Sequence, residues 1–496
     1  MGFSIEAANA LSVHSGVDQA LAKLTLAQAS RLIRSRSLTP IQLTAATLRR
    51  IGSHDPKLNA FITVIGEDAM AQARELNREQ ASGNLRSQLH GIPIALKDNI
   101  DAAGAPTTAA SNIYRHRVPR EDAEVTRRLR EAGAVIVGKL NLHEFAAGGT
   151  GHVSAFGTTR NPWKLDYVTG GSSSGSGGAV AGRLCFGALG TDTGGSIRIP
   201  SSWCGITGLK PTYGLVSIRG IVPLIYSLDH CGPMTRTAED AAIMLNAIAG
   251  YDPQDPASLN HPKEDYVAAL QQPTESFRIG TPEEFFVDLD SEVADAVEAA
   301  IGVICSLTSG VSSRNRMPDC EDFLLFIAET HCFHEEFMRV SSHLYQVETR
   351  LFLTKFKAPS VFQYIRARDR LIELRRSVES AFQDFDLVVF PTERVLPFTI
   401  ERAIASGQRA VAVEGIPPQE WITIANTYQF NMYGLPALTL PCGFSREGLP
   451  IGLTIAGPRL SEGKILALAA AYQKATDWHL WMPPVETAHP EPPLSA

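Results

Sequence analysis

Two segments rich in glycine and serine lie close together in the sequence, GGSSSGSGGAVAG at 170–182 and GTDTGGSIRIP at 190–200. In the second segment, the glycines before Ser196 allow successive backbone N–H groups to point into one concavity. Acyl transfer requires such a nest beside a serine, because the tetrahedral oxyanion needs preorganised donors. Flexible linkers rarely contain the apolar residues that interleave these glycines. The pattern favours an acyl-transfer site around Ser196, with an oxyanion hole formed by the amides of Thr193, Gly194 and Gly195.

A serine is a poor nucleophile without a base, and neither glycine- and serine-rich segment contains a histidine. Lys97 directly follows the apolar run GIPIAL, so we expect it at the end of a buried strand, where active sites of α/β sheets are usually found. Burial there would disfavour the charged form and lower the pKa of the lysine. Lys97 is therefore the candidate base, whereas an isolated lysine is usually a solvated surface residue.

GSSSG at 171–175 matches the GxSxG nucleophile elbow, with Ser173 at its centre. Such an elbow lies between a central strand and a helix. The preceding stretch, WKLDYVTG, lacks the apolar run of a central strand. We therefore consider an α/β-hydrolase mechanism through Ser173 the weaker alternative.

Two further motifs are incomplete. GAVIVGKL at 133–140 fits GxxxxGK but has a leucine where a phosphate loop needs serine or threonine. His143 and His334 each precede a glutamate, but neither has the second histidine of HExxH. The sequence therefore predicts neither an ATP site nor a zinc site.

The order of apolar patterns indicates how these residues are positioned. Helical spacing at the start of the chain is followed by short apolar runs at 92–96, 134–138 and 185–190, which helix-like polar stretches separate. This alternation predicts an α/β fold with a largely buried sheet. Alternating amphipathic helices follow in the middle of the chain, before strand character returns near residue 386.

Composition limits the classes of partner. The 496 residues carry a formal charge of −7 and no long basic run, so we expect no direct nucleic-acid partner. No apolar stretch reaches the roughly 18 residues of a membrane span, and the N-terminus lacks the features of a signal peptide. The seven cysteines show no zinc-ligand spacing, which favours buried reduced thiols. These features together predict a cytoplasmic protein without a membrane segment.

The chain resembles the amidase-signature family. HGIPIALKDNI, TGGSSSGSGGAVAG and GTDTGGSIRIPSSWCGITGLKPTYG match that family's three hallmark blocks in order, and Lys97, Ser172 and Ser196 have the expected spacings. The resemblance implies an amidase-signature fold, a large twisted mixed β-sheet covered by helices on both faces. It also implies one amidase domain over 1–496, with N-terminal helices (1–85), a signature core (86–272), a helical excursion that shapes the substrate pocket (273–385), a return to the core sheet (386–480) and a Pro-rich tail (481–496).

The family resemblance also implies roles for single residues. Ser196 would attack an amide carbonyl, Ser172 in a cis peptide would connect it to Lys97, and neutral Lys97 would accept the proton. The acyl-enzyme would then be hydrolysed to a carboxylate, with release of ammonia or an amine, without a metal or organic cofactor. Ser173, Asp192 and Arg198 are expected to hold the two glycine- and serine-rich segments in register. Asp192 and Arg198 are expected to form an ion pair.

The substrate pocket is less well defined by the sequence. Thr150, Gly151 and His152 precede the first serine block and are expected to border the pocket. The loop 393–422, which contains Trp421, would help to shape it. An apolar lining would favour aryl or alkyl amides, anilides or carbamates.

Three functions within the family stay open. The A subunit of glutaminyl/asparaginyl-tRNA amidotransferase shares several motifs, but its GYYDAYY-like segment has no counterpart at 330–371. We therefore expect a stand-alone amidase acting on a small-molecule amide. A non-catalytic binding subunit is disfavoured, because Lys97, Ser172 and Ser196 are all present. The resemblance further implies a homodimer.

Overall fold

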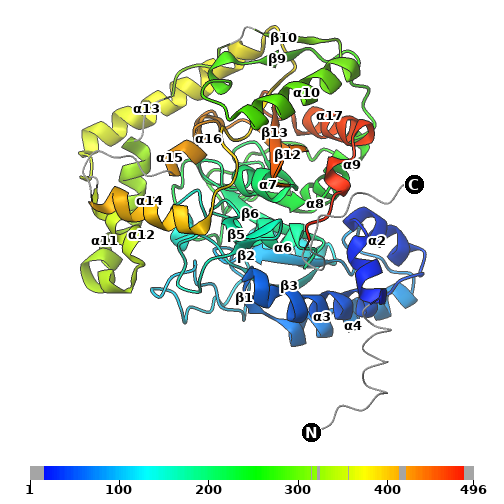
Figure 1. Cartoon of the computed structure of the whole chain (residues 1–496). Coiled ribbons are helices and arrows are strands. Elements are labelled where there is room, and N and C mark those ends of the chain that lie inside the picture. Colours follow the sequence, from blue (N-terminus) through cyan, green and yellow to red (C-terminus); the bar gives the residue numbers. More distant parts are fainter. Residues whose placement is uncertain (1–15, 314–315, 321–323, 356, 413–419, 485–496) are drawn as a thin grey trace.

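The computed structural model describes residues 16–313, 316–320, 324–355, 357–412 and 420–484. Its centre is a mixed sheet of 11 strands, which confirms the expected α/β class and mixed sheet (Figure 1). In spatial order the strands are β1 (Phe61–Val64), β3 (Val135–Leu140), β2 (Pro93–Lys97), β6 (Gly187–Asp192), β8 (His230–Thr235), β7 (Thr207–Lys210), β12 (Ala437–Phe444), β13 (Pro450–Ala456), β11 (Leu387–Pro391), β9 (Ile279–Thr281) and β10 (Val311–Ser313).

The three apolar runs that predict strands form β3, β2 and β6, which are adjacent and parallel. Every residue in these three strands is buried, as expected for strands covered on both faces. Along β2, Ile94 and Leu96 belong to a core cluster shared with α8 (Ala238–Ile248), α10 (Ser291–Leu307) and α17 (Glu462–Ala475). Ala95 belongs to a second cluster shared with α3 (Pro40–Leu58), α4 (Gly66–Ala81) and α6 (Ser174–Ala181). Successive side chains therefore pack on opposite faces, each covered by helices.

Helices precede, connect and follow the strands. At the start of α3 (Pro40–Leu58), the Thr39 hydroxyl accepts the N–H of Gln42, and Pro40 occupies the first helical position. The α-helices are α2 (Leu26–Arg34), α3 (Pro40–Leu58), α4 (Gly66–Ala81), α5 (Glu124–Glu131), α6 (Ser174–Ala181), α7 (Arg198–Cys204), α8 (Ala238–Ile248), α9 (Tyr266–Ala269), α10 (Ser291–Leu307), α11 (Leu324–Ser341), α12 (Val347–Lys355), α13 (Val361–Ser377), α14 (Ile400–Ala412), α15 (Glu420–Thr423), α16 (Tyr428–Met432) and α17 (Glu462–Ala475).

Shorter elements complete the described fold. A separate two-stranded sheet lies just before α6 and does not join the central sheet. Its strands and the short 3-10 helices are β4 (Arg160–Asn161), β5 (Lys164–Val168), η1 (Glu144–Ala146), η2 (Glu283–Phe285), η3 (Ser342–Leu344), η4 (Val378–Phe382) and η5 (Trp478–Leu480).

The segment 273–385 is mostly helical, and α11, α12 and α13 lie together at one side of the molecule (Figure 1). It also contains β9 and β10, two strands of three residues that extend the sheet at one edge. The expected helical excursion is therefore attached to the sheet by strands too short to stand out in the sequence. The proposed shaping of the substrate pocket by this segment stays a prediction.

The expected loop at 393–422 is wrong in part, because α14 occupies residues 400–412. The Thr399 hydroxyl accepts the N–H of Arg402 and so satisfies one of the free donors at the start of this helix. Residues 413–419 of the loop and 485–496 of the predicted Pro-rich tail lie outside the described residues.

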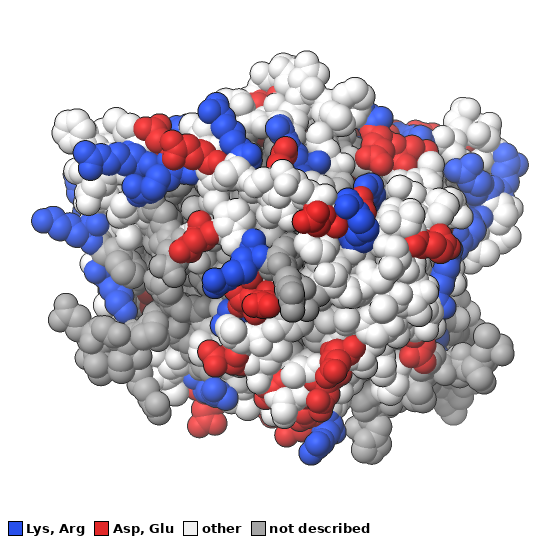
Figure 2. Space-filling view, turned by 90° about the horizontal axis from the view of Figure 1, so that it is seen from above, with Lys and Arg blue, Asp and Glu red and all other residues white. Residues whose placement is uncertain are grey.

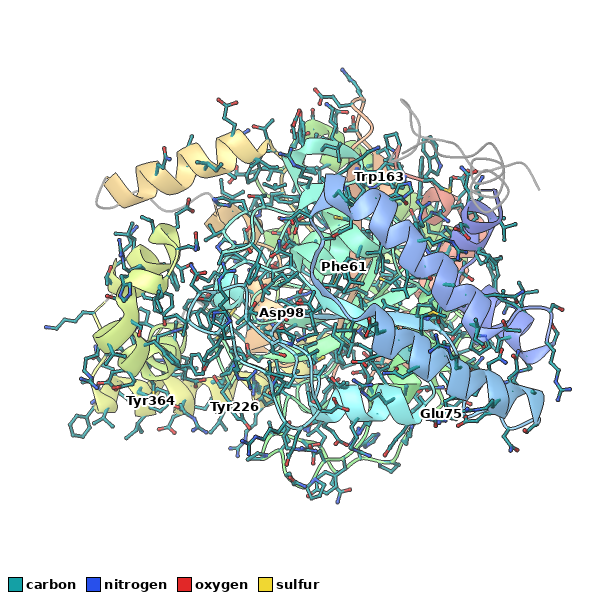
Figure 3. The ribbon with its side chains drawn as sticks, turned by 90° about the horizontal axis from the view of Figure 1, so that it is seen from below. Phe61, Glu75, Asp98, Trp163, Tyr226 and Tyr364 are labelled. Carbon is teal, nitrogen blue, oxygen red and sulfur yellow. The ribbon has the colours of Figure 1, made fainter. Side chains whose placement is uncertain are left out.

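The surface seen from above carries both signs of charge. On this face the Lys and Arg side chains lie intermixed with Asp and Glu (Figure 2). Within the described ranges, no helix is long and apolar enough to span a bilayer. Seen from below, labelled Asp98 lies towards the interior, whereas Glu75 and Tyr364 lie towards the periphery (Figure 3).

Candidate active site

Lys97 is the last residue of β2, and its side chain is fully buried. The Nζ atom donates hydrogen bonds to Ser172 Oγ at 2.7 Å and to Thr191 Oγ1 at 2.8 Å. The Thr191 carbonyl, at 3.3 Å, is a third acceptor. Thr191 lies on the neighbouring strand β6, so the parallel pairing of the two strands brings the lysine to Thr191.

Burial lowers the pKa of Lys97 to about 7, against the opposing effects of the Asp192 and Asp229 charges. A substantial fraction of the side chain is therefore neutral near neutral pH. Neutral lysine has a lone pair on Nζ, so the 2.7 Å contact can carry a proton from the Ser172 hydroxyl to the amine. The expected burial of Lys97 at a strand end is confirmed, whereas its role as the base stays a prediction.

Ser172 is fully buried, and its peptide bond to Gly171 is cis, as the family resemblance implies. Gly171 donates its N–H to the Gly149 carbonyl at 2.7 Å. The backbones approach so closely that a Cβ on Gly171 would lie 2.6 Å from the nitrogen of Gly151. The segment before the first serine block therefore packs directly on the cis peptide, where only glycine fits.

Ser196 lies in the loop 193–197 between β6 and α7, which we call the nucleophile loop. It is 8% exposed, so it is buried but still touches solvent. The Ser173 N–H donates to the Ser196 carbonyl at 3.3 Å, and this bond brings the nucleophile loop to the serine-rich segment. The structure thus gathers the two serine segments and Lys97 at one point of the sheet.

One of the three expected oxyanion donors is already engaged. The Gly195 N–H donates to Asp192 Oδ1 at 2.8 Å. Within the described residues, no hydrogen bond engages the N–H groups of Thr193, Gly194 or Ser196. In this arrangement the donors left for an oxyanion are these three amides. The sequence motif could not reveal that the Gly195 amide is engaged, because it does not show which backbone N–H binds the Asp192 carboxylate.

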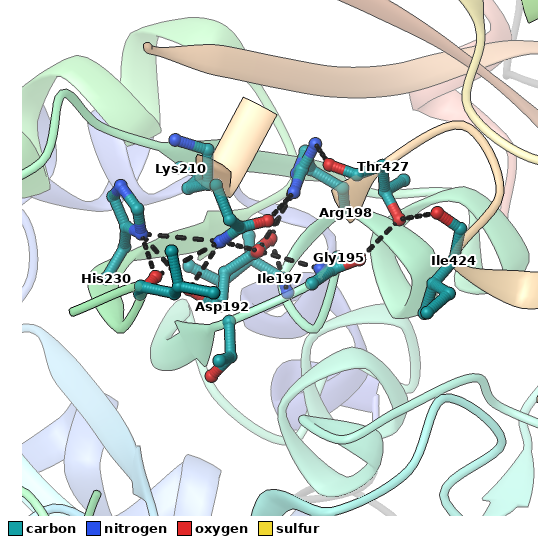
Figure 4. A network of polar contacts seen from close by, with 12 residues as sticks. Asp192, Gly195, Ile197, Arg198, Lys210, His230, Ile424 and Thr427 are labelled. Carbon is teal, nitrogen blue, oxygen red and sulfur yellow. Dashed lines mark hydrogen bonds and ion pairs between the residues drawn. The ribbon is translucent and has the colours of Figure 1, made fainter. Parts of the chain in front are cut away.

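The expected ion pair of Asp192 with Arg198 is present, is fully buried and has an N–O distance of 2.9 Å (Figure 4). Although burial raises the pKa of Asp192, the Arg198 guanidinium holds it below its usual range. Arg198 also donates to the Thr427 carbonyl at 2.7 Å and to Asn431 Oδ1 at 2.7 Å. The Thr427 hydroxyl donates to the Gly194 carbonyl at 2.6 Å. The segment 424–431 therefore holds the nucleophile loop from outside.

Replacing Arg198 with methionine is expected to lower the free energy of unfolding by about 3–5 kcal/mol, because the Asp192 charge is left buried without its partner. Thermal and urea denaturation measure the loss. The matched control is Arg339→Met, which removes an ion pair with Glu336 at the surface. Equal stability of the two variants would contradict the structural role of the buried pair.

Ser173, the centre of the competing elbow motif, is fully buried, and its hydroxyl donates to the Thr191 carbonyl at 3.2 Å. The nearest preceding strand is β5, which belongs to the separate two-stranded sheet. A nucleophile elbow needs an exposed serine after a central strand. Ser173 has neither feature and instead links the serine-rich segment to the end of β6.

The expected pocket residues have different outcomes. Thr150 Oγ1 and His152 Nδ1 are 2.7 Å apart, and His152 Nε2 lies 3.1 Å from the Glu348 carboxylate on α12. This contact connects the segment before the first serine block to α12. Thr150 and Gly151 lie near the cis peptide, but their contact with substrate stays a prediction. Trp421 lies on α15, and its side chain is outside the described part of the structure.

A cavity of about 720 Å³ lies beside the nucleophile loop. Two of its lining residues, Ile424 and Tyr428, are also the nearest neighbours of Gly194, since a Cβ on that glycine would lie 3.8–4.0 Å from their side chains. The cavity has both apolar and charged walls. The lining residues are Glu284, Phe285, Arg316, Met317, Pro318, Asp319, Cys320, Arg394, Ile424, Ala425, Tyr428, Gln429 and Tyr433.

Several residues at the site have no sequence signal. Thr191, Asp229, Thr427 and Asn431 all lie outside the residues expected to act, although Thr191 is inside the GTDTGGS block. Each contacts the site from a segment whose position depends on the tertiary fold. In the parts of the chain described, no cluster of three or more His, Cys, Asp or Glu side chains could hold a metal ion.

Comparison with known families places this fold and site in one class of protein. The family profile described as Amidase matches residues 42–466. This is most of the chain, and the protein therefore belongs to the amidase-signature family, as its three sequence blocks indicate.

Within the family, the chain is 40% identical to the glutamyl-tRNA(Gln) amidotransferase A subunit of Roseiflexus sp. (strain RS-1), over 94% of this chain and 99% of the relative. The structure of the corresponding A subunit from Thermotoga maritima has a TM-score of 0.73 at 30% identity, covering 92% of this chain and 96% of that chain. A 6-aminohexanoate cyclic dimer hydrolase has a TM-score of 0.84 at 26% identity, covering 94% and 99%.

Proposed function

We propose that this protein cleaves the C–N bond of a carboxamide through an acyl-Ser196 intermediate. The observation that carries the proposal is the 2.7 Å contact between Lys97 Nζ and Ser172 Oγ, made by a buried lysine whose pKa is lowered to about 7. Ser196 supplies the nucleophile, Ser172 relays its proton, and Lys97 is the base. The family supports this class of chemistry.

In the first half-reaction, the Ser196 oxygen attacks the amide carbonyl carbon, and its proton passes through Ser172 to neutral Lys97. The carbonyl oxygen becomes an oxyanion, which the amides of Gly194, Ser196 and Thr193 stabilise. The proton then returns from Lys97 through Ser172 to the leaving nitrogen, and the C–N bond breaks. Water repeats the sequence on the acyl-enzyme and releases the carboxylate, which restores Ser196.

Two functions within this chemistry have specific support. The relatives named as amidotransferase A subunits match nearly the whole chain at 37–40% identity, which favours that alternative over the stand-alone amidase expected from the sequence. The different segment at 330–371 and the apolar Ile424 beside Gly194 support a stand-alone amidase. A non-catalytic binding subunit is the third alternative, and the intact Lys97–Ser172 contact argues against it.

Substrate preference separates the first two alternatives. We propose that the apolar part of the substrate lies against Ile424 and Tyr428, because these side chains connect the cavity to the nucleophile loop. An apolar wall at this point favours aryl or alkyl amides, anilides or carbamates, whereas the charged residues elsewhere in the cavity would suit the charged amino acid end of glutamine. The homodimer, the cytoplasmic location and the absence of a direct nucleic-acid partner stay predictions.

The test compares glutamine, aliphatic amides, an anilide and a carbamate as substrates of the purified protein without any partner protein. Turnover of the anilide but not of glutamine supports the stand-alone amidase. Glutamine turnover that appears only with the other components of an amidotransferase complex supports the A-subunit function. An inert protein under all these conditions would leave the non-catalytic alternative.

Replacing Ile424 with aspartate is expected to lower kcat/KM for the anilide roughly tenfold or more, because the new carboxylate must be desolvated against an apolar group. Steady-state kinetics measure the change. The matched control is Ile422→Asp, in the same short segment, where the side chain is 45% exposed. If both variants keep wild-type kinetics, the substrate does not lie against this wall.

A further inference from the structure

Asp229 is a buried carboxylate that the proposed reaction does not use. It is 5% exposed and directly precedes β8. Its Oδ2 accepts the N–H of Leu224 at 2.9 Å and that of Ile225 at 3.2 Å. Its Oδ1 accepts the hydroxyl of Thr193 at 2.5 Å. The carboxylate thus joins a turn of the chain to the first residue of the nucleophile loop.

The pairing of the strands explains why Asp229 lies there. His230 on β8 is directly opposite Asp192 on β6, so the residues flanking this pair, Asp229 and Thr193, meet where the two strands separate. The next residue of the loop is Gly194, and its carbonyl accepts the Thr427 hydroxyl at 2.6 Å. Thr193 and Gly194, two of the residues whose amides are left for an oxyanion, are therefore fixed by two different segments.

We propose that Asp229 is a positioning residue for this reaction, which fixes Thr193 and so aims the oxyanion donors, and which also acts through its charge on Lys97. The inference rests on the proposed function of Ser196 and Lys97. Neither the family motif nor the contacts of the predicted triad assign a role to Asp229.

The electrostatic part follows from the groups around Lys97. Burial lowers the pKa of Lys97, and the charges of Asp192 and then Asp229 raise it. Cys231 also faces the lysine, but burial raises the pKa of its thiol to about 12, so the thiol is neutral at neutral pH. His143 faces it too and is neutral, because burial holds its pKa well below the usual value. Asp192 forms an ion pair with Arg198. Asp229 is the other carboxylate whose charge favours the ammonium form of Lys97.

The pKa of the Asp229 carboxyl is itself raised above its ordinary value. Burial raises its pKa to about 6, against the hydrogen bonds from Thr193, Ile225 and Leu224 and the charge of Lys97. The carboxylate is thus mainly ionised at neutral pH and becomes protonated only slightly below it. The charge that acts on Lys97 is therefore present in the pH range where the base must work.

The experiment compares Asp229→Asn, Thr193→Val and Thr193→Ser. Asp229→Asn is expected to lower kcat about 10- to 100-fold with little change in KM, because the oxyanion donors are less well aimed. It is also expected to move the acid limb of the pH profile of kcat/KM to lower pH, because the lost charge no longer stabilises protonated Lys97. Thr193→Val is expected to lower kcat similarly without moving the limb. Thr193→Ser keeps the hydroxyl and is expected to recover most of the activity.

A structural control separates positioning from folding. Asp255 is also a buried carboxylate that accepts loop N–H groups, from Ile218 and Ala257, but it lies outside the site. Asp255→Asn is expected to keep the wild-type acid limb. Thermal denaturation of all variants shows whether each remains folded.

The rate of Ser196 modification by a fluorophosphonate, followed by intact mass against pH, gives a readout that needs no substrate. Failure of the wild-type protein to react at Ser196 overturns the proposed function. Reaction of the wild type with an acid limb that does not move in Asp229→Asn, or a Thr193→Val protein as active as wild type, overturns only the role of Asp229. A shifted limb in Asp229→Asn and an unshifted, slower Thr193→Val protein support that role.

Discussion

Replacing Ser196 with alanine is expected to lower kcat/KM for any amide substrate by about 10³-fold or more, because no other group can form the acyl-enzyme. The oxyanion donors and the binding cavity remain in the variant, so substrate affinity is expected to change little. Intact mass spectrometry of the wild type during turnover should show the acyl adduct, and peptide mapping should locate it on Ser196. The adduct should be absent from the variant.

The comparison variant is Ser173→Ala, which removes the serine of the competing elbow motif. Its hydroxyl donates to the backbone carbonyl of Thr191 and not to Lys97 or Ser172, so we expect activity within about tenfold of wild type. Strong loss in Ser173→Ala together with a fully active Ser196→Ala protein would transfer the nucleophile to Ser173 and reject the mechanism proposed for Ser196.

Replacing Lys97 with methionine is expected to lower kcat/KM by about 10³-fold, since the variant has no base to accept the proton that Ser172 relays. In the wild type, kcat/KM should fall tenfold per pH unit below about pH 7, because burial lowers the pKa of Lys97 to about 7 and the protonated amine cannot act as a base. The side chain is neutral above that pH, so the rate should reach a plateau there. Steady-state kinetics across the pH range measure both effects.

Lys97→Arg separates the base from the hydrogen-bond donor. Arginine can still donate to Ser172 and Thr191, but it does not lose its proton in proteins. We therefore expect Lys97→Arg to be as inactive as Lys97→Met, with both variants folded by thermal denaturation. An active Lys97→Arg protein would show that the site needs a cation at this position and not a base.

The sequence predicts the central part of this site because two strong local signals coincide. The apolar run before Lys97 identifies a buried strand end, and the glycines around Ser172 and Ser196 identify places where backbone must approach closely. The ion pair of Asp192 with Arg198 is also local, six residues apart on the two sides of the nucleophile loop. Spacing within one segment is sufficient for each of these predictions.

The remaining contacts depend on residues far away in the chain. Asp229 and Thr427 reach the nucleophile loop, and Asn431 reaches the adjoining Asp192, only because strand pairing and the segment 424–431 bring them there. An isolated aspartate or threonine has no pattern that would reveal such a role. The Gly195 amide shows the same limit, because its hydrogen bond to Asp192 depends on the exact turn of the backbone.

Errors in the predicted elements also have physical causes. The helix α14 follows a polar, Pro-containing stretch, and its stability comes in part from the capping hydroxyl of Thr399. The strands β9 and β10 have three residues each, which is too short for a periodic signal. Both become recognisable only from their partners in the sheet.

The position of β12 and β13 in the sheet has a consequence for synthesis of the chain. These are the last two strands in the sequence, yet they lie between β7 on one side and β11 on the other. The part of the sheet that runs in space from β1 to β7 and the part formed by β9, β10 and β11 are thus joined by the last strands described in the chain. The segment 424–431, which holds the nucleophile loop, is also made late. A nascent chain can therefore form the contact between Lys97 and Ser172 early, whereas the contacts from 424–431 to the nucleophile loop and the pairing of β7 with β12 can form only when synthesis is almost finished.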